Sequence, residues 1–136
     1  MDGVIITPLK EIAHDKGNIF HALKKSDNGY LGFGEAYFSS IKSGAIKGWK
    51  KHNEMTLNLI VPIGEVEFVL YNKGKFEQFI LSPRNYCRLT IPPNIWVAFR
   101  GLAPFDSMLL NIANIEHNPS ESEACELNDI PYVWRP

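Results

Sequence analysis

The chain has 136 residues, 45% hydrophobic and 21% charged, which is typical of a globular protein with one domain, residues 1–136. Fourteen Lys and Arg against fifteen Asp and Glu give a net charge of −1, which argues against a nucleic-acid-binding protein with a broad positive surface. No apolar run reaches the ~18 residues of a membrane span, and Met1-Asp2-Gly3 does not begin a signal peptide. Cys87 and Cys125 lack metal-site spacing, so we expect reduced thiols, a cytosolic protein, and no nucleic-acid or membrane partner.

Short apolar segments separated by proline and glycine dominate the chain. Where apolar and polar residues alternate, the pattern predicts half-buried strands, as in Val66, Phe68 and Leu70 against Glu65 and Glu67. Asn-Lys-Gly at 72–74 predicts a hairpin turn, with Gly74 at positive φ. Strands are expected at residues 46–52, 57–61, 66–70, 87–91 and 108–112.

Many short strands at turn spacing predict an all-β protein, built as an antiparallel sandwich or barrel. From residue 116 onward the chain becomes acidic, which predicts a solvated surface segment with one short helix. Pro131-Tyr132-Val133-Trp134 is aromatic enough to hold this segment against the body of the protein.

The richest candidate for chemistry is the segment from Lys47 to Glu54. If residues 46–52 form a strand, Lys50 and His52 lie on the same face, because strand side chains alternate. An ammonium beside an imidazole on an inward face suits an anionic or carbonyl-bearing ligand. The alternative is an exposed basic edge strand, in which lysine discourages aggregation.

Other kinds of site find little support in the sequence. His21 alternates with Ile19 and is expected to face inward, whereas His14 and His117 lie in polar surroundings. No two histidines have the spacing of metal ligands, so no metal site is predicted. A Gly-x-Ser-x-Gly elbow and a glycine-rich phosphate loop are both absent.

Three segments resemble the dTDP-4-dehydrorhamnose 3,5-epimerase family of cupin-type barrels. Residues 15–21 are similar to its Asp-x-Arg-Gly-x-Phe-Phe-Glu motif, and residues 43–52 with 64–66 to its Gly-Val-x-Arg-Gly-x-His and Gly-Glu-Val motifs. Residues 81–92 are similar to its Leu-Ser-x-x-Asn-x-Arg-x-Leu-x-Ile-Pro stretch. Over residues 4–134 the resemblance implies a cupin-type antiparallel β-barrel (jelly roll) with a short helical or irregular C-terminal segment. It also implies a homodimer that exchanges the N-terminal strand at residues 4–6.

Several positions depart from the family pattern. Lys50 stands in place of the catalytic histidine, and Asn111 in place of the tyrosine that acts as general acid. Lys16 and Lys47 replace arginines that contact the diphosphate or nucleotide, and His21 replaces a glutamate. The metal-binding positions of other cupins read Lys50, His52, Leu57 and Val97, a set that cannot hold a transition metal.

Two functions follow from the resemblance and its departures. The first is a cofactor-free epimerase or ketoisomerase of a nucleoside-diphosphate 4-keto-6-deoxyhexose, in which His52 is the base and Tyr37 donates a proton. Lys50 either polarises the ketone or, if desolvated, itself acts as a base. The predicted substrate-binding residues are Lys16, His21, Lys47, Arg88 and Asn111. The second is a non-catalytic binding module or partner protein that keeps the pocket after losing the usual acid and base.

Overall fold

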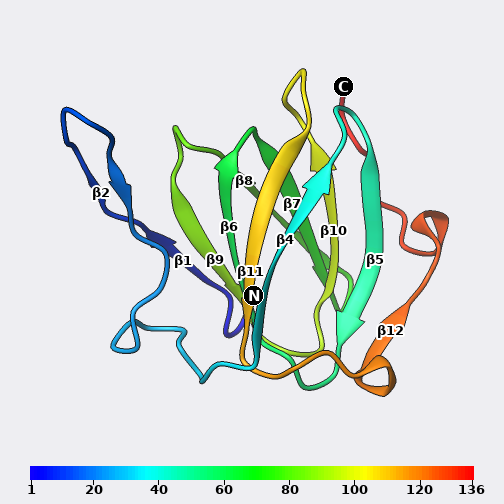
Figure 1. Ribbon diagram of the computed structural model, residues 1–136. Coiled ribbons are helices and arrows are strands. Elements are labelled where there is room, and N and C mark those ends of the chain that lie inside the picture. The colour runs from blue at the N-terminus through cyan, green and yellow to red at the C-terminus, as the bar shows by residue number, and fades with distance from the viewer.

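The computed structural model describes residues 1–136, and its secondary structure is almost entirely antiparallel strand. Two five-stranded sheets make up the body of the protein (Figure 1). In spatial order, the first sheet contains β1 (Ile5–Pro8), β9 (Cys87–Ile91), β6 (Leu57–Ile63), β11 (Ser107–Ala113) and β4 (Glu35–Ile41). The second contains β12 (Ser122–Ala124), β5 (Ile46–His52), β10 (Trp96–Gly101), β7 (Val66–Asn72) and β8 (Lys75–Leu81).

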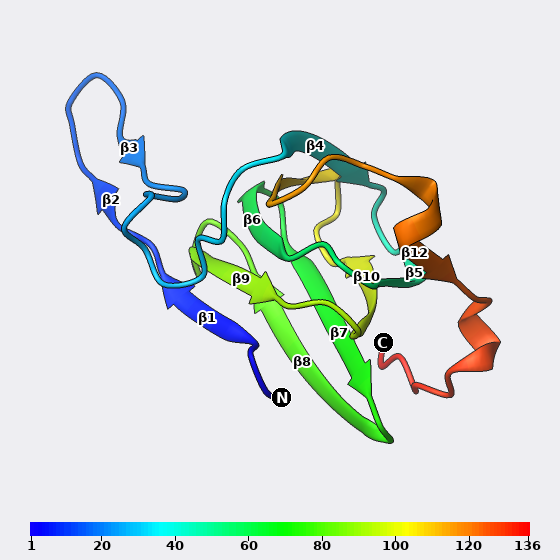
Figure 2. The ribbon, with the colours of Figure 1, turned by 90° about the horizontal axis from the view of Figure 1, so that it is seen from below.

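The two sheets face each other and enclose the main hydrophobic core (Figure 2). Leu59 and Leu109 of the first sheet pack in one cluster with Phe68 and Leu70 of the second. Because all neighbouring strands except the β7–β8 hairpin come from distant parts of the chain, the arrangement is a jelly roll. The predicted all-β, cupin-type barrel is confirmed.

A second, smaller cluster covers the outer face of the second sheet. Trp49, Val69 and Ala98 pack there against Ile130, with Trp134 of the C-terminal segment beside them. The sequence predicts a half-buried strand at residues 66–70, yet all five residues are buried. That prediction was wrong about the outer face because the C-terminal segment shields it from water.

The turn between β7 and β8 has the predicted form. Lys73 and Gly74 have φ values of 50° and 81°, and Asn72 pairs with Lys75. Positive φ at both central residues is the geometry of a two-residue type I′ hairpin, which glycine adopts without steric cost.

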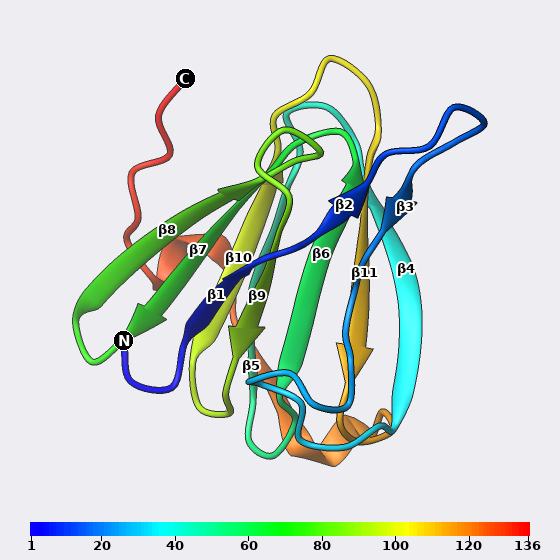
Figure 3. The same cartoon turned by 90° about the vertical axis from the view of Figure 1, so that its left-hand side faces the viewer.

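Two segments lie outside the barrel. The hairpin of β2 (Glu11–Ile12) and β3 (Ile19–Phe20) stands away from the two sheets (Figure 3). The C-terminal segment contains two short 3₁₀ helices, η1 (Pro119–Glu121) and η2 (Leu127–Asp129), which agrees with the predicted short helical or irregular segment. At three residues each, these helices are far too short to cross a bilayer.

Candidate active site

A cavity of about 110 Å³ opens between the two sheets. Four of the predicted site residues, Tyr37, Lys50, His52 and Asn111, line it together. The rest of its wall is mostly apolar and consists of Ser39, Leu57, Leu59, Phe68, Val97, Phe99 and Leu109. The structure therefore brings the proposed base, cation and proton donor to one place.

The register of β5 against β10 explains why two lysines lie on this side of the sheet. Lys50 pairs with Val97 and Lys47 with Phe99, so the β5 segment is one residue longer and forms a bulge. Gly48 lies in this bulge, where an added Cβ would come within 2.4 Å of the Ala98 Cβ. Lys47 does not line the cavity itself; its Nζ lies 5.9 Å from the ring centroid of Phe99, which does.

His52 is the buried end of this strand, with 8% of its surface exposed. Its Nδ1 is hydrogen-bonded to the carboxylate of Glu121, which is 4% exposed. A carboxylate only accepts, so Nδ1 carries the hydrogen, and in the neutral imidazole Nε2 has the free lone pair. Histidine and carboxylate thus form a buried pair whose imidazole lines the cavity.

The Glu121 carboxylate is held in its ionised form. Burial acts to raise its pKa, but the hydrogen bond with His52 and those from the backbone N–H groups of Glu54 and Met55 outweigh it. Both N–H groups donate to Oε2 at 3.2 Å. The pKa of Glu121 therefore lies below its ordinary value, and the charge is available to stabilise an imidazolium at His52.

Tyr37 comes from the opposite sheet. It lies on β4 directly across from Asn111 on β11, and the Asn111 Nδ2 donates to its hydroxyl oxygen at 3.2 Å. His52 and Tyr37 therefore face the cavity from different walls.

The cavity is electropositive. Lys50 is exposed at its edge, and the wall contains no Asp, Glu or Arg. Nowhere in the chain do three His, Cys, Asp or Glu side chains gather as metal ligands. The site suits an anionic or carbonyl-bearing ligand.

Lys16 and His21 are not brought into the cavity of their own chain. Lys16 is exposed in the turn between β2 and β3, where its backbone N–H donates to His14 Nδ1 at 3.0 Å. His21 was expected to face inward, but it lies beside Lys10 and Lys24 in a shallow depression near the base of the hairpin. The hairpin diverges from the barrel, which is why alternation along it does not lead to the core.

Arg88 requires a correction. It was predicted to bind substrate, but it is fully buried and lies outside the cavity. Its guanidinium donates to the carbonyls of Ala22 (2.8 Å) and Asn28 (3.0 Å), to Asn58 Oδ1 (3.1 Å) and to Asp27 (3.3 Å). These contacts hold the 22–28 loop on the first sheet, so Arg88 is a structural residue.

Glu121 is the residue of the candidate site that the sequence did not reveal. The acidic run after residue 116 was interpreted as a solvated surface, and most of it is exposed. Glu121 differs because β12 pairs with β5, placing Ser122 opposite His52. Asn118 precedes Pro119 and caps η1, which is the one local sign that the chain turns inward here.

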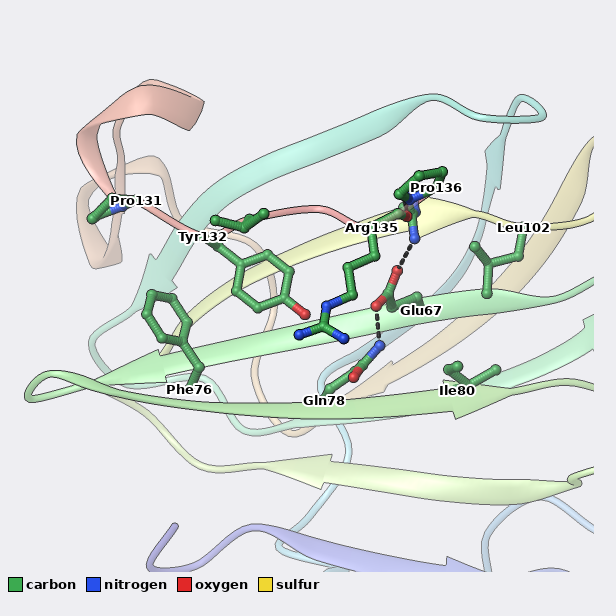
Figure 4. A pocket seen from close by; sticks show the side chains of 11 residues that line it. Glu67, Phe76, Gln78, Ile80, Leu102, Pro131, Tyr132, Arg135 and Pro136 are labelled. Carbon is green, nitrogen blue, oxygen red and sulfur yellow. Dashed lines mark hydrogen bonds and ion pairs between the residues drawn. The ribbon is translucent and has the colours of Figure 1, made fainter.

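The largest hollow in the molecule lies elsewhere, on the outer face of the second sheet (Figure 4). This groove of about 840 Å³ runs between the C-terminal segment and the strands β7 and β8. At its floor the buried Glu67 accepts hydrogen bonds from Arg100, at 2.7 Å, and from Gln78, while Arg100 also donates to the carbonyl of Arg135. Its polar groups thus serve to hold the tail, and we place the candidate active site in the smaller cavity.

Comparison with known structures identifies the family. The crystal structure of a dTDP sugar isomerase from Desulfovibrio desulfuricans matches this chain with a TM-score of 0.93 and 31% sequence identity, covering 98% of this chain and 91% of that one. The chain belongs to the dTDP-sugar isomerase family. It is a divergent member, because Lys50 and Asn111 replace the histidine and tyrosine of the epimerase motifs. The predicted family resemblance is confirmed.

Two solved structures of lower sequence identity share the fold. The sugar 3,4-ketoisomerase QdtA from Thermoanaerobacterium thermosaccharolyticum, solved with TDP, has a TM-score of 0.80 and 18% identity over 90% of this chain and 88% of that one. The dTDP-4-dehydrorhamnose 3,5-epimerase from Sulfolobus tokodaii has a TM-score of 0.86 and 19% identity over 99% and 84%. The spore coat polysaccharide biosynthesis protein SpsL of Bacillus subtilis is 23% identical over 130 residues, which cover 90% of this chain and 86% of SpsL. No protein-family model matches the sequence.

Proposed function

We propose that this protein is an epimerase or ketoisomerase of a nucleoside-diphosphate 4-keto-6-deoxyhexose in deoxysugar biosynthesis. The observation that carries the proposal is the buried His52–Glu121 pair, which presents an imidazole to the same cavity as Lys50 and Tyr37. The dTDP sugar isomerase at 31% identity supports the substrate class.

The reaction begins with proton removal. Nε2 of His52 takes the proton from the carbon beside the ketone, and the electron pair of the C–H bond moves onto the ketone oxygen to give an enolate. Glu121 stabilises the imidazolium that forms, while the Lys50 ammonium stabilises the negative oxygen. All three groups belong to this chain and lie at or beside the cavity.

Tyr37 completes the reaction from the opposite wall. Its hydroxyl proton passes to carbon, and the cycle closes when the phenolate recovers a proton from solvent and the His52 imidazolium releases one to solvent. Return of a proton to the same carbon on its other face gives the epimer. Return of a proton to the former ketone carbon gives the ketoisomer, provided that the hydroxyl proton of the first carbon moves to the former ketone oxygen. Placing base and acid on opposite walls serves epimerisation most directly.

The size of the cavity indicates which part of the ligand enters. Its volume of about 110 Å³ equals roughly four water molecules at ~30 Å³ each, enough for the reacting edge of a sugar ring. The diphosphate then lies outside, where Lys50 is exposed and Lys47 follows along β5. Lysine offers phosphate a point charge without the bidentate geometry of arginine.

The alternative is a binding module without turnover. The substituted histidine and tyrosine positions favour it, whereas the buried imidazole–carboxylate pair favours catalysis, because binding a sugar does not require a base with a charged partner.

Deuterium exchange separates the two. Incubating the protein with dTDP-4-keto-6-deoxyglucose in heavy water, followed by NMR of the sugar protons, should show deuterium at C3 or C5. His52→Gln should abolish exchange while dTDP still binds, and Lys50→Met should slow it. If the wild type bound the keto sugar without any exchange, the proposal of an enzyme would be contradicted and that of a binding module would be supported.

A homodimer is part of the proposal. The hairpin, the loop that precedes β4 and β4 itself expose large apolar side chains, with Leu31 66%, Phe33 64%, Phe38 64%, Ile19 57% and Phe20 49% exposed. Exposed apolar surface of this kind fits a subunit interface. Light scattering at micromolar concentration should give twice the 15.4 kDa chain mass, and a monomer would contradict the dimer.

The cytosol remains the expected location, consistent with the free thiols of Cys87 and Cys125.

A further inference from the structure

Asn111 was predicted to contact the substrate, but both polar atoms of its side chain already have protein partners. It is 1% exposed, on the inner face of β11. The Asn58 backbone N–H donates to its Oδ1 at 3.2 Å, and its Nδ2 donates to the Tyr37 hydroxyl at 3.2 Å.

The backbone bond settles the orientation of this amide. A backbone N–H can only donate, so the Asn111 oxygen must face Asn58 and the nitrogen must face Tyr37. The pairing of Tyr37 with Asn111 across β4 and β11 holds the two side chains side by side. The direction of the hydrogen bond between them is therefore fixed by the fold.

This direction determines what the tyrosine can do. Because its oxygen accepts from Asn111, its single hydrogen is not used in that bond, and its hydroxyl makes no other hydrogen bond in the structure. Tyr37 lines the cavity, so the hydrogen is free to point toward a ligand. We propose that Asn111 is a positioning residue that keeps Tyr37 a proton donor, an inference that rests on the function proposed above.

Two substitutions separate this role from simple support of the strand. Asn111→Leu removes both hydrogen bonds. Asn111→Asp keeps an acceptor for the Asn58 N–H but replaces the donor by a second acceptor, which captures the Tyr37 hydrogen. A purely structural Asn111 would tolerate aspartate better than leucine, whereas a positioning Asn111 loses turnover with both.

A double-mutant cycle with Tyr37→Phe tests the inference by deuterium exchange. Tyr37→Phe removes the proton donor and should slow exchange by about a hundredfold, and each Asn111 variant should slow it by about tenfold or more with dTDP affinity unchanged. In the Tyr37→Phe background, the Asn111 variants should change the rate by less than about twofold, because their effect passes through the missing hydroxyl. Multiplicative losses would overturn the inference.

Asn114 provides a matched control. Its Oδ1 accepts the Thr56 backbone N–H at 2.7 Å, without any tyrosine partner. Asn114→Leu should lower the melting temperature but leave exchange and its Tyr37 dependence intact, and an Asn111-like loss of rate would contradict the assignment.

The same double-mutant cycle can be measured on ligand affinity, which does not require turnover. The affinity for the keto sugar relative to dTDP alone should fall about tenfold in Asn111→Asp, and not fall further in the double variant with Tyr37→Phe. If the variants show this coupling in binding but the wild type shows no deuterium exchange, the proposed chemistry is wrong and the role of Asn111 in orienting Tyr37 stands. Exchange without coupling overturns the role of Asn111 alone.

Discussion

The His52 imidazole meets the Glu121 carboxylate in the wall of the barrel, although 69 positions separate the two residues in the chain. Pairing of β12 with β5 brings them together, since Ser122 lies opposite His52 and the Asn53 N–H donates to the Glu121 carbonyl at 2.7 Å. The C-terminal segment is thus a component of the candidate active site as well as a cover for the second sheet.

Replacing Glu121 by glutamine tests the electrostatic role of this pair. If its oxygen keeps the backbone N–H groups of Glu54 and Met55, the amide turns its NH2 toward His52 Nδ1. It then carries no charge to stabilise an imidazolium, and it favours the neutral tautomer with the hydrogen on Nε2, which lacks the lone pair that the base needs. We expect deuterium exchange to slow by about 100-fold or more, with little change in dTDP affinity. Rates from NMR and affinities from calorimetry measure the two effects.

Glu123→Gln is the matched control for that experiment. Glu123 lies two residues further along the same segment, is exposed, and forms an ion pair with Lys51 at 3.3 Å. Exposed pairs of this kind contribute ~1 kcal/mol or less, so exchange should be unchanged. If both variants lose activity equally, the effect belongs to the segment as a whole and the special role of Glu121 is refuted.

Glu121 should also make the fold sensitive to acid. Its pKa is lower in the folded protein than the ordinary value of 4.5. The carboxylate therefore stabilises the fold fully above that value, and the contribution is lost as the pH falls through the folded pKa. The difference in unfolding free energy between wild type and Glu121→Gln should be largest near neutral pH and shrink below about pH 4.5. Urea unfolding at several pH values measures it, and a difference that stays constant from neutral to strongly acidic pH would exclude this origin.

Local pattern was sufficient for much of the barrel. The predicted strand at residues 46–52 coincides with β5, and Lys50 and His52 share the cavity as alternation requires. The turn at 72–74 was predictable because positive φ favours specific residue types. These features depend on neighbours in sequence, which is where propensity and periodicity act.

Features that depend on distant segments were not predictable from pattern. Glu121 resembles the other acidic residues around it, and only its pairing partner distinguishes it. Arg88 matches a family motif, yet its guanidinium is used by a loop some 60 residues earlier in the chain. A motif gives a position in the chain, whereas burial depends on what the rest of the chain packs against it.

Lys50 and Lys51 provide a direct test of the orientation of β5. Lys50 lines the cavity, while Lys51 lies on the other side of the strand, with its Nζ 5.1 Å from the ring centroid of Trp96. Lys50→Met should lower kcat/KM for the keto sugar by about tenfold or more, because a charged hydrogen bond to the ligand is lost. Lys51→Met should leave it unchanged. Equal effects of the two variants would mean that the net charge of the strand matters and its register does not.

Arg88→Met should destabilise the protein without altering ligand affinity. The variant leaves the carbonyls of Ala22 and Asn28 without the Arg88 donor and Asp27 without its cationic partner. Asn58 Oδ1 keeps only its hydrogen bond from the Thr90 hydroxyl. Removing one member of such a buried network costs about 3 kcal/mol or more, which urea unfolding would show as a lower midpoint at the same slope. The exposed Arg84 provides the control, since Arg84→Met should change the midpoint little. If folded Arg88→Met bound dTDP much more weakly than wild type, the guanidinium would have to act on the ligand, and its assignment to the loop would be wrong.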